Sequence, residues 1–539
     1  MTKHPIAYFS AEYGLDARLP IYAGGLGVLS GDTLKAAADF GQDLVAVGLL
    51  YRGKKAVQQL DQSGWQTESD LDFEPEAVGL KPLFYQGQKV EITLRLADKV
   101  VFLNVWEKTI SPTVRLFLLD TNHQKNQLEI QAINDSLYFG EARKQFQQQL
   151  ILGLGGGRLL QHLGLKPKVY HLNEGRAAFL VWELIRQLKL FSDLELDEIK
   201  QIIRSNLVYT NHTLVPAGSF TIPLDQIITV AGPLAQELGL GIEQLIGPGL
   251  VNDGQTFSPT RLVMTFARRH SGVSQLHTQL SKEIWPDLSW VNITNGVHLP
   301  TWQDERLVKL SDLSDIELEQ IHQDNKNQLE QIAFERTGYH YDPNRLIVGW
   351  ARRLAGYKRL DAVFAEIDQL AQILKNQDRP IQLLIAGKAH QEDERGKKML
   401  QQVISYLSQE LAGHALFIPN YDLDLARYMV RGCDVWLNLP ERGKEACGTS
   451  GMKAISNGVL QCTTLDGWTD EVDWTGRGWV VDSTQVSSSL YQVLANQVGP
   501  LFYQDRPGWL QQMRRSIELA EQFSAKRMFS QYLEKLYLL

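Results

Sequence analysis

The chain has 539 residues, of which 44% are apolar and 22% charged, with a net charge of −8 and an isoelectric point near 5.9. Single hydrophobic cores stop growing at about 250 to 300 residues, so this length predicts at least two domains. The composition is that of a globular protein and excludes a collagen-like or largely disordered chain. The acidic balance disfavours a nucleic-acid partner, which needs a concentrated basic surface, and leaves a neutral polymer compatible.

The start of the chain and its cysteines indicate a cytoplasmic protein. Met1–Pro5 leads into the apolar run Ile6–Phe9 without a signal-peptide core or cleavage site, and no apolar stretch reaches the roughly 18 to 20 residues of a membrane span. Cys433, Cys447 and Cys462 are odd in number and lack metal-ligand spacing. We therefore expect a reducing compartment, no membrane partner, no disulfide framework and no metal site.

The first motif in chain order is the glycine cluster YAGGLGVLSGD, with Gly24, Gly25 and Gly27 ahead of a helix expected to begin near Asp32. Glycines let backbone N–H groups approach a phosphate, and a helix N-terminus adds positive potential. A plain turn explains the same pattern equally well.

The N-terminal part alternates short apolar strands with helices. Strands are predicted at 44–50, 169–172 and 207–210, and the second is followed by a helical pattern over 177–185. A second glycine cluster, GLGGGR at 153–158, lacks the last glycine of the dinucleotide fingerprint and follows a helical run where that fingerprint needs a strand. We interpret it as a helix break that allows close packing.

A domain boundary is predicted near residue 340, because a helix over 315–336 ends in turn signals at 339–344. Beyond it, strands at 346–350 and 381–387 each precede a helical pattern, which indicates parallel βαβ units. The expected fold class is α/β, with two Rossmann-like domains facing a cleft. We assign residues 1–340 and 341–505 to these domains and 506–539 to a C-terminal helical segment, because apolar residues recur there at helical spacing.

The segment ARRLAGYKR follows the strand at 346–350 and carries Arg352, Arg353, Lys358 and Arg359. Four cations at the carboxyl end of a strand suit a phosphorylated ligand, because arginine forks around phosphate and lysine supplies a point charge. The alternative is a solvated basic face.

The segment ERGKEACGTSGMKAISNG, residues 441–458, combines the carboxylate of Glu445, a small-residue turn at 448–451 and Lys453. Backbone amides and hydroxyls in such a turn can hold an anion, and the lysine behind it can bind a carbonyl compound covalently. The alternative is an ordinary helix start with a solvated lysine.

At these residues the chain resembles the glycogen phosphorylase family, most closely its compact bacterial and archaeal members. The resemblance runs from YFSAEYGL to the last helix and includes HLNEGRAAF, YTNHT, ITNGVHLPTW, ARRLAGYKR, NYD and EACGTSGMK in the family's order. It implies a glycosyltransferase fold of the GT-B type and phosphorolysis of α-1,4-glucan or maltodextrin by inorganic phosphate, giving glucose 1-phosphate with retention. It also implies pyridoxal 5'-phosphate as cofactor, acting through its phosphate group.

The resemblance assigns roles residue by residue. Lys453 matches the lysine that binds the cofactor, and Tyr421 matches a tyrosine near its ring. The groups matched to the cofactor phosphate are Thr449, Ser450, Arg352 and the amide of Gly25. Arg353 and Lys358 match the pair that binds the substrate phosphate. The residues matched to the glucosyl unit are His212 and Asn295 at its 6-hydroxyl, Glu445, Gly448 and Tyr357 at its other hydroxyls, and Leu26 and Trp302 as lining.

This chain departs from the family pattern at Arg176, where relatives have histidine, and at Cys447, where they have serine. The first change affects the side of the site that binds the leaving glucan. The segment that is phosphorylated in animal enzymes is missing, so we do not expect control by its phosphorylation. An oligomer is compatible with the sequence.

Two other functions remain open. One is a nucleotide-sugar-dependent glucan synthase, which has the same architecture, but Tyr22 and Ala23 stand where such synthases carry K-x in their K-x-G-G-L motif. The other is a glucan-binding homologue that has lost turnover, since fold alone does not imply function.

Overall fold

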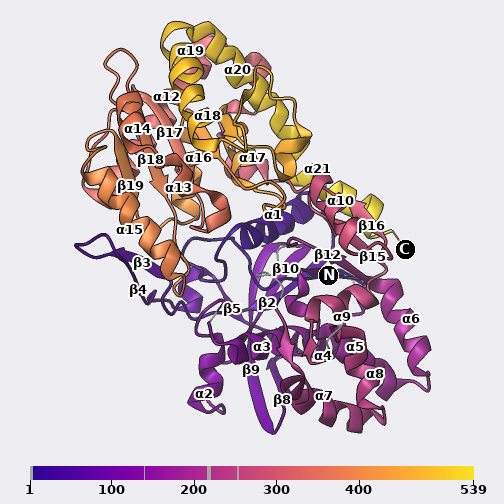
Figure 1. Cartoon of the computed structure of the whole chain (residues 1–539). Coiled ribbons are helices and arrows are strands. Elements are labelled where there is room, and N and C mark those ends of the chain that lie inside the picture. Colours follow the sequence, from indigo (N-terminus) through magenta and orange to yellow (C-terminus); the bar gives the residue numbers. More distant parts are fainter. Residues whose placement is uncertain (1–3, 139, 215–219, 252–253, 539) are drawn as a thin grey trace.

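The computed structural model describes residues 4–138, 140–214, 220–251 and 254–538 (Figure 1). It contains two large sheets with helices packed around them, so the expected α/β fold class with two Rossmann-like halves is confirmed. Within the described residues no helix is both long and apolar enough to cross a membrane.

The first sheet lies in the N-terminal half and has the order β16-β15-β12-β11-β1-β2-β10-β9-β5, with β8 paired to β9. Pairing is parallel from β16 to β10 and antiparallel beyond it. Its strands are β1 (Ile6–Phe9), β2 (Leu44–Leu49), β5 (Lys81–Pro82), β8 (Glu91–Leu96), β9 (Lys99–Ser111), β10 (Val114–Asp120), β11 (Val169–Asn173), β12 (Leu207–Thr210), β15 (Arg269–Gly272) and β16 (Trp290–Asn292). The three strands expected at 44–50, 169–172 and 207–210 are β2, β11 and β12.

The second sheet has the order β19-β18-β17-β20-β21-β22, and every pair in it is parallel. In chain order this is 3-2-1-4-5-6, the strand order of the Rossmann fold. The strands are β17 (Leu346–Ala351), β18 (Ile381–Ala386), β19 (Ala415–Ile418), β20 (Val435–Asn438), β21 (Leu460–Thr463) and β22 (Gly478–Val480). Every residue of β17 and β18 is buried, because helices cover both faces of a parallel sheet.

The helices follow the predicted strand–helix alternation, with two shifted starts. In the first half they include α1 (Gly25–Asp39), α3 (Ala142–Leu150), α4 (Gly156–His162), α5 (Leu180–Phe191), α6 (Leu196–Asn206), α7 (Leu224–Leu238), α9 (Pro259–Phe266) and α10 (Gln275–Ile284). Helix α1 begins at Gly25, so the expected start near Asp32 is wrong: two of the three clustered glycines belong to its first turn. The pattern at 177–185 becomes helical only at Leu180, after a 3₁₀ turn at Gly175–Ala177.

The second half is surrounded by α12 (Asp315–Thr337), α14 (Ile367–Leu374), α15 (Glu394–Ser408), α16 (Leu423–Gly432), α17 (Ser450–Ile455), α18 (Val486–Val493) and α20 (Arg506–Leu519). Helix α12 packs against α16 and α20. The division at residue 340 remains a prediction. The chain then returns to the first half through α21 (Ala525–Gln531) and η13 (Tyr532–Leu536), which pack against α1 and β15 (Figure 1).

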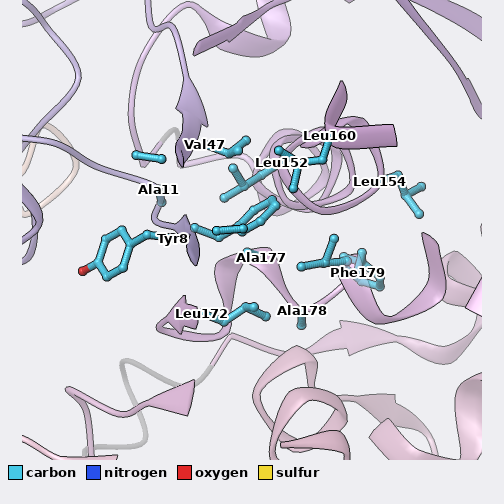
Figure 2. Packing of buried hydrophobic residues seen from close by; sticks show 14 of the residues in the cluster. Tyr8, Ala11, Val47, Leu152, Leu154, Leu160, Leu172, Ala177, Ala178 and Phe179 are labelled. Atoms are coloured by element: carbon cyan, nitrogen blue, oxygen red, sulfur yellow. The ribbon is translucent and has the colours of Figure 1, made fainter. Parts of the chain in front are cut away.

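The glycine cluster at 153–158 does not break the helix, so that expectation is wrong. A π-helical turn, η3 (Ile151–Gly155), joins α3 to α4 without interruption. The close packing is present: a Cβ on Gly153 would lie 2.5 Å from the backbone nitrogen of Leu180, and one on Gly156 would lie 2.5 Å from Phe9. Figure 2 shows the leucines of this segment beside Val47 and near the turn at 177–179.

A Gly153→Ala substitution should therefore lower the free energy of unfolding by about 1–3 kcal/mol, the usual cost of overpacking, because its Cβ meets backbone that cannot rotate away. Urea unfolding measures this. The matched control is Gly232→Ala within α7, where a Cβ meets no atom within 4 Å and should stabilise by up to about 1 kcal/mol. Equal effects of the two substitutions would contradict the packing argument.

Candidate active site

Some of the site residues expected from the sequence follow the carboxyl ends of the strands at which a sheet reverses its strand order. In the second sheet this point lies between β17 and β20, whose ends lead into Arg352 and Leu439. In the first sheet it lies between β1 and β11, whose ends lead into Ser10 and Glu174. Ligands of open α/β sheets bind at such points, so each sheet offers an expected ligand-binding edge.

Lys453 is a buried amine, with only 6% of the residue exposed. Its Nζ lies 4.0 Å from the centroid of the Trp302 ring, so residues from the two halves of the chain meet here. Burial lowers the pKa of Lys453 to about 8, while the carboxylate of Asp32 partly opposes this shift. The alternative of a solvated lysine is therefore wrong. A lysine whose pKa is lowered in this way is suited to bind a carbonyl carbon covalently, because a larger fraction of it is unprotonated than of an ordinary lysine.

Asp32 fixes the ring beneath this amine. Its Oδ2 accepts hydrogen bonds from Trp302 Nε1 at 2.8 Å and from the backbone nitrogen of His298 at 3.2 Å. Trp302 was expected to line the glucosyl site, and its ring lies against the Lys453 amine. The orientation of the indole is set by its hydrogen bond to Asp32 of helix α1.

Arg352 lies beside this pocket and points its donors at several acceptors. Nη1 is 3.3 Å from Glu445 Oε2, and Nη2 donates to Ser450 Oγ at 3.2 Å and to Asn438 Oδ1. The Nε donor is buried and has no hydrogen-bond partner among the described residues. A buried guanidinium with a spare donor, next to the hydroxyl of Ser450, fits an anionic group such as a phosphate.

The glycine cluster contributes backbone donors from the first half. Gly25 is the first residue of α1, where amide groups have no partner within the helix. A Cβ on Gly24 or Gly25 would meet no atom within 4 Å, so both backbones border open space. Glu12 holds the loop, because its Oε2 accepts from Ala23 N at 2.8 Å and from Gly24 N at 3.2 Å. Val28 of α1 shares a hydrophobic cluster with Trp302 and Met452, which places this turn against the Lys453 pocket.

Lys358 and Glu445 form the centre of the second-half site. Lys358 Nζ donates to Glu445 Oε2 and lies 4.9 Å from the centroid of the Tyr357 ring. Although burial opposes it, the attraction of Lys358 and Arg352 lowers the pKa of Glu445, which therefore stays ionised. Arg353, by contrast, projects an exposed side chain. The solvated-face alternative thus fails for Arg352, whereas Arg353 is exposed and its side chain hydrogen-bonds to Tyr357.

The turn around Glu445 is held by hydrogen bonds to Asp466. Asp466 accepts from the backbone nitrogens of Glu445 at 2.8 Å and Gly443 at 2.9 Å, and burial raises the pKa of Asp466 to about 6. A Cβ at residue 448 would lie 1.7 Å from Glu445 Oε1, so a larger residue there would displace the Glu445 carboxylate. Cys447 is half-buried, and burial raises the pKa of its thiol far above the usual range, so it is not a nucleophile.

His212 extends from the end of β12 and is held in one tautomer. Its Nε2 is 2.6 Å from Asn173 Oδ1, and its backbone nitrogen donates to Glu174 Oε1 at 2.6 Å. Burial lowers the pKa of His212 to about 3, so the ring is neutral. Because Nε2–H donates to Asn173, Nδ1 is left as an acceptor, which suits a hydroxyl group.

Asn295 follows β16 and is 2% exposed. Its backbone nitrogen donates to Val273 O at 3.0 Å, whereas its side-chain Oδ1 is buried without a partner among the described residues. An unpaired buried acceptor is costly unless a ligand donates to it, so Asn295 is a binding candidate on structural grounds alone.

The remaining expected residues line these pockets. Tyr421 and Leu26 are half-buried, and Thr449 is buried next to the start of α17. Tyr421 and Tyr22 pack against the same cluster as Trp302 and Met452. Tyr421 therefore lies near the Lys453 pocket, whereas His212 and Asn295 extend from strand ends of the first sheet.

Arg176, the residue that departs from the family pattern, does not pair with Glu174. Its Nη1 donates to Gln145 Oε1 at 2.9 Å, and its guanidinium carbon lies 5.2 Å from the Tyr138 ring centroid and 5.3 Å from that of Phe220. Tyr138 in turn donates to Glu12, which holds the glycine turn. Arg176 is thus connected to the site through Tyr138 and Glu12.

Sequence reasoning did not single out two carboxylates at the strand ends. Glu12 fixes the glycine turn. Glu174 accepts a hydrogen bond from the backbone nitrogen of His212 and itself has a rare backbone conformation, with φ of 74° and ψ of 167°. Strained residues of this kind cluster at functional sites and cost about 1–3 kcal/mol. The available signal was a carboxylate within three residues of the end of a buried strand, in YFSAEYGL and HLNEGRAAF.

Comparison with known proteins places this site in a family. The model of the carbohydrate phosphorylase family matches residues 305–475, which include Arg352, Lys358, Glu445 and Lys453. The chain is 35% identical to a maltodextrin phosphorylase of Thermococcus litoralis, over 99% of this chain and 70% of that protein. It is 34% identical to a glycogen phosphorylase of Mycobacterium tuberculosis, over 99% and 70% of the two chains. It is 32% identical to a glycogen phosphorylase of Aquifex aeolicus, over 99% and 86%. The resemblance stated from the motifs is thereby confirmed: the chain belongs to the carbohydrate phosphorylase family.

Proposed function

We propose that this chain is a cytoplasmic α-glucan phosphorylase that uses pyridoxal 5'-phosphate to convert α-1,4-glucan or maltodextrin and inorganic phosphate into glucose 1-phosphate with retention. Membership of the phosphorylase family implies a glycosyltransferase-type enzyme. The observation that carries the proposal is a buried amine, Lys453, beside a spare buried guanidinium donor on Arg352 and close to a second cation, Lys358.

The residues present fit the cofactor. Lys453 would hold its carbonyl carbon and Tyr421 would flank its ring. The groups that would hold its phosphate are Arg352, Thr449, Ser450 and the Gly25 amide. When bound, pyridoxal phosphate supplies a phosphate group that exchanges a proton with the substrate phosphate. Lys453 is buried, so little water would reach the site of this proton exchange.

The residues of the chain bind and orient the reacting groups. Arg353 and Lys358 neutralise the substrate phosphate, since two phosphates brought together in a low-dielectric site repel strongly. His212 accepts from the glucosyl 6-hydroxyl through Nδ1, and Asn295 contacts the same hydroxyl. Glu445, Tyr357 and the Gly448 backbone orient the other hydroxyls. Lys358 and Arg352 keep Glu445 charged, so it acts as an acceptor.

Glucan synthesis from a nucleotide sugar is the second candidate, because the two functions share a fold. Lys453 argues against it: a nucleotide-sugar enzyme has no need of a buried amine with a lowered pKa in this position. A glucan-binding homologue without turnover is disfavoured by the complete set of cations and hydroxyl-binding groups.

The deciding experiment incubates the protein with maltodextrin and phosphate and measures glucose 1-phosphate, in parallel with maltodextrin and nucleoside-diphosphate glucose. We expect phosphate-dependent release of glucose 1-phosphate and no transfer from the nucleotide sugar. The reverse result would establish the synthase. Glucan binding without either reaction would establish the non-catalytic homologue.

Arg176→His should change the Michaelis constant for oligosaccharide more than that for phosphate. The substitution removes the contacts of Arg176 to Gln145 and to the rings of Tyr138 and Phe220, on the side of the site that the family resemblance gives to the leaving glucan. Loss of one such polar contact corresponds to a change of about 5- to 10-fold. Steady-state kinetics with each substrate varied in turn measures it. Unchanged constants together with lower thermal stability would show that Arg176 only packs the fold.

A further inference from the structure

The C-terminal end of the chain reaches the loop that carries Asn295. After α20 the chain crosses back to the first half, where α21 packs against α1 and η13 packs against β15 (Figure 1). Arg527 of α21 donates from Nη1 to the carbonyl oxygen of Thr294 at 2.6 Å and from Nη2 to that of Asn295 at 2.9 Å. One guanidinium thus binds two consecutive carbonyls, and the second belongs to a residue expected to touch the sugar.

The backbone on the other side of Asn295 is fixed by the same segment. The amide of Val297 donates to Phe523 O at 2.9 Å, and the amide of Ala525 donates back to Val297 O at 2.7 Å. A Cβ on Gly296 would lie 2.2 Å from Ser524 O, so only glycine permits this approach. Residues 523–527 therefore hold the loop 294–297 by four hydrogen bonds to its backbone, at Thr294, Asn295 and Val297.

A carboxylate from the second half holds the loop as well. Both oxygens of Glu471 accept from Thr294 Oγ1, at 3.0 and 2.9 Å, and Oε1 also accepts from Gln275 N at 2.8 Å. Glu471 also attracts the Arg527 guanidinium electrostatically. Thr294 is thus held by Arg527 through its carbonyl and by Glu471 through its hydroxyl, so the direction of the next residue is fixed.

We propose that Arg527 is a positioning residue for sugar recognition: it aims the side chain of Asn295 at the glucosyl 6-hydroxyl without touching the sugar itself. This inference rests on the proposed function, in which Asn295 contacts that hydroxyl. Asn295 Oδ1 is buried and unpaired among the described residues, so its ligand contact depends on the backbone that carries it. Hydrogen bonds are directional and weaken steeply when their geometry is lost, so a released loop loses recognition before it loses its fold.

The test compares glucose 1-phosphate with 6-deoxyglucose 1-phosphate as donors for glucan elongation, using the cofactor-loaded full chain. The ratio of their kcat/KM values reports recognition of the 6-hydroxyl. Arg527→Gln should lower this ratio by about 10-fold, the value of a hydrogen bond to a buried polar group. Arg527→Lys, which keeps the charge but cannot fork between two carbonyls, should lower it less. Asn295→Ala should lower the ratio as well, and adding Arg527→Gln to it should lower it no further.

Arg269→Gln is the matched control. Arg269 also donates to carbonyl oxygens of the C-terminal segment, those of Lys535 at 2.8 Å and Leu538 at 3.3 Å. Within the described residues it makes no hydrogen bond to the loop 294–297. The Arg269→Gln substitution should leave the ratio of the two kcat/KM values unchanged even if it lowers the stability of the protein. A ratio for Arg527→Gln within twofold of the unmodified chain, or equal to that of Arg269→Gln, would overturn the proposal. If Arg527→Gln does not fold, the kcat/KM ratio of Arg527→Lys is compared with those of the unmodified chain and Arg269→Gln, and the same criterion applies.

Failure of the proposed function would appear differently, as no turnover of glucose 1-phosphate by the unmodified chain. The positioning role then remains testable by hydrogen exchange. Arg527→Lys should speed exchange of the Asn295 and Val297 amides by about 10-fold or more relative to Arg269→Gln. Equal exchange in the two variants would overturn the positioning role whatever the reaction.

Discussion

Replacing Lys358 by alanine is expected to lower kcat/KM for phosphorolysis by about 10²- to 10³-fold. Removing one preorganised group opposite a developing anion typically costs about 2.7–4 kcal/mol, and Lys358 is the buried cation proposed to meet the substrate phosphate. The Michaelis constant for phosphate should rise more than that for glucan. Initial rates at varied phosphate and maltodextrin concentrations measure both.

The fold should tolerate this change, because Glu445 keeps Arg352 as a partner at 3.3 Å when Lys358 is removed. Lys444→Ala is the matched control: Lys444 lies one residue from Glu445, is exposed and pairs with Glu441 at 3.0 Å. It should have near-normal kinetics. Near-normal turnover by Lys358→Ala would show that ARRLAGYKR is only a basic surface.

Lys453→Ala is expected to abolish covalent cofactor binding and to lower phosphorolysis by more than about 10³-fold, because it removes the attachment of a whole catalytic group rather than one hydrogen bond. In the unmodified chain, borohydride reduction after loading with pyridoxal phosphate should fix about one cofactor per chain on Lys453. Peptide mass spectrometry identifies the modified lysine.

Lys388 provides an internal control for this labelling. Burial lowers the pKa of Lys388 to about 8 as well, and its Nζ donates to Ala56 O at 3.2 Å. Its amine is therefore as unprotonated as that of Lys453 but lacks the neighbouring Arg352 and Ser450. Label on Lys388 in place of Lys453, or no label after loading, would contradict the proposed cofactor site.

The strands, and the polar motifs that follow them, could be predicted from the sequence because parallel strands are buried on both faces. Runs such as 44–50 and 346–350 are apolar throughout, and the polar motifs follow their carboxyl ends. This was sufficient for the fold class and for placing Arg352 and Lys358 after a strand, whereas Lys453 was grouped with them through the family resemblance. The pairing of Lys358 with Glu445 depends on residues 87 apart in sequence, which no local pattern reveals.

Two predictions about where glycines interrupt or precede helices were wrong. Glycine has low helix propensity, so Gly25 and Gly153–Gly157 were expected to lie outside or interrupt helices. In the structure all of them are helical, and at Gly153 and Gly156 glycine is needed because Leu180 and Phe9 approach too closely to admit a Cβ. The positive φ of Glu174 is likewise invisible in sequence, because glutamate rarely adopts it without tertiary support.

The most direct measurement of the central claim is ³¹P NMR of maltodextrin and inorganic phosphate with the cofactor-loaded protein and with Lys453→Ala. We predict that the phosphate signal declines as the signal of α-glucose 1-phosphate grows, at a rate that depends on both the cofactor and Lys453. A β-anomer as first product, growth that is independent of the cofactor, or no new phosphate ester with the loaded protein would contradict the assignment of this chain as a retaining, pyridoxal-phosphate-dependent α-glucan phosphorylase.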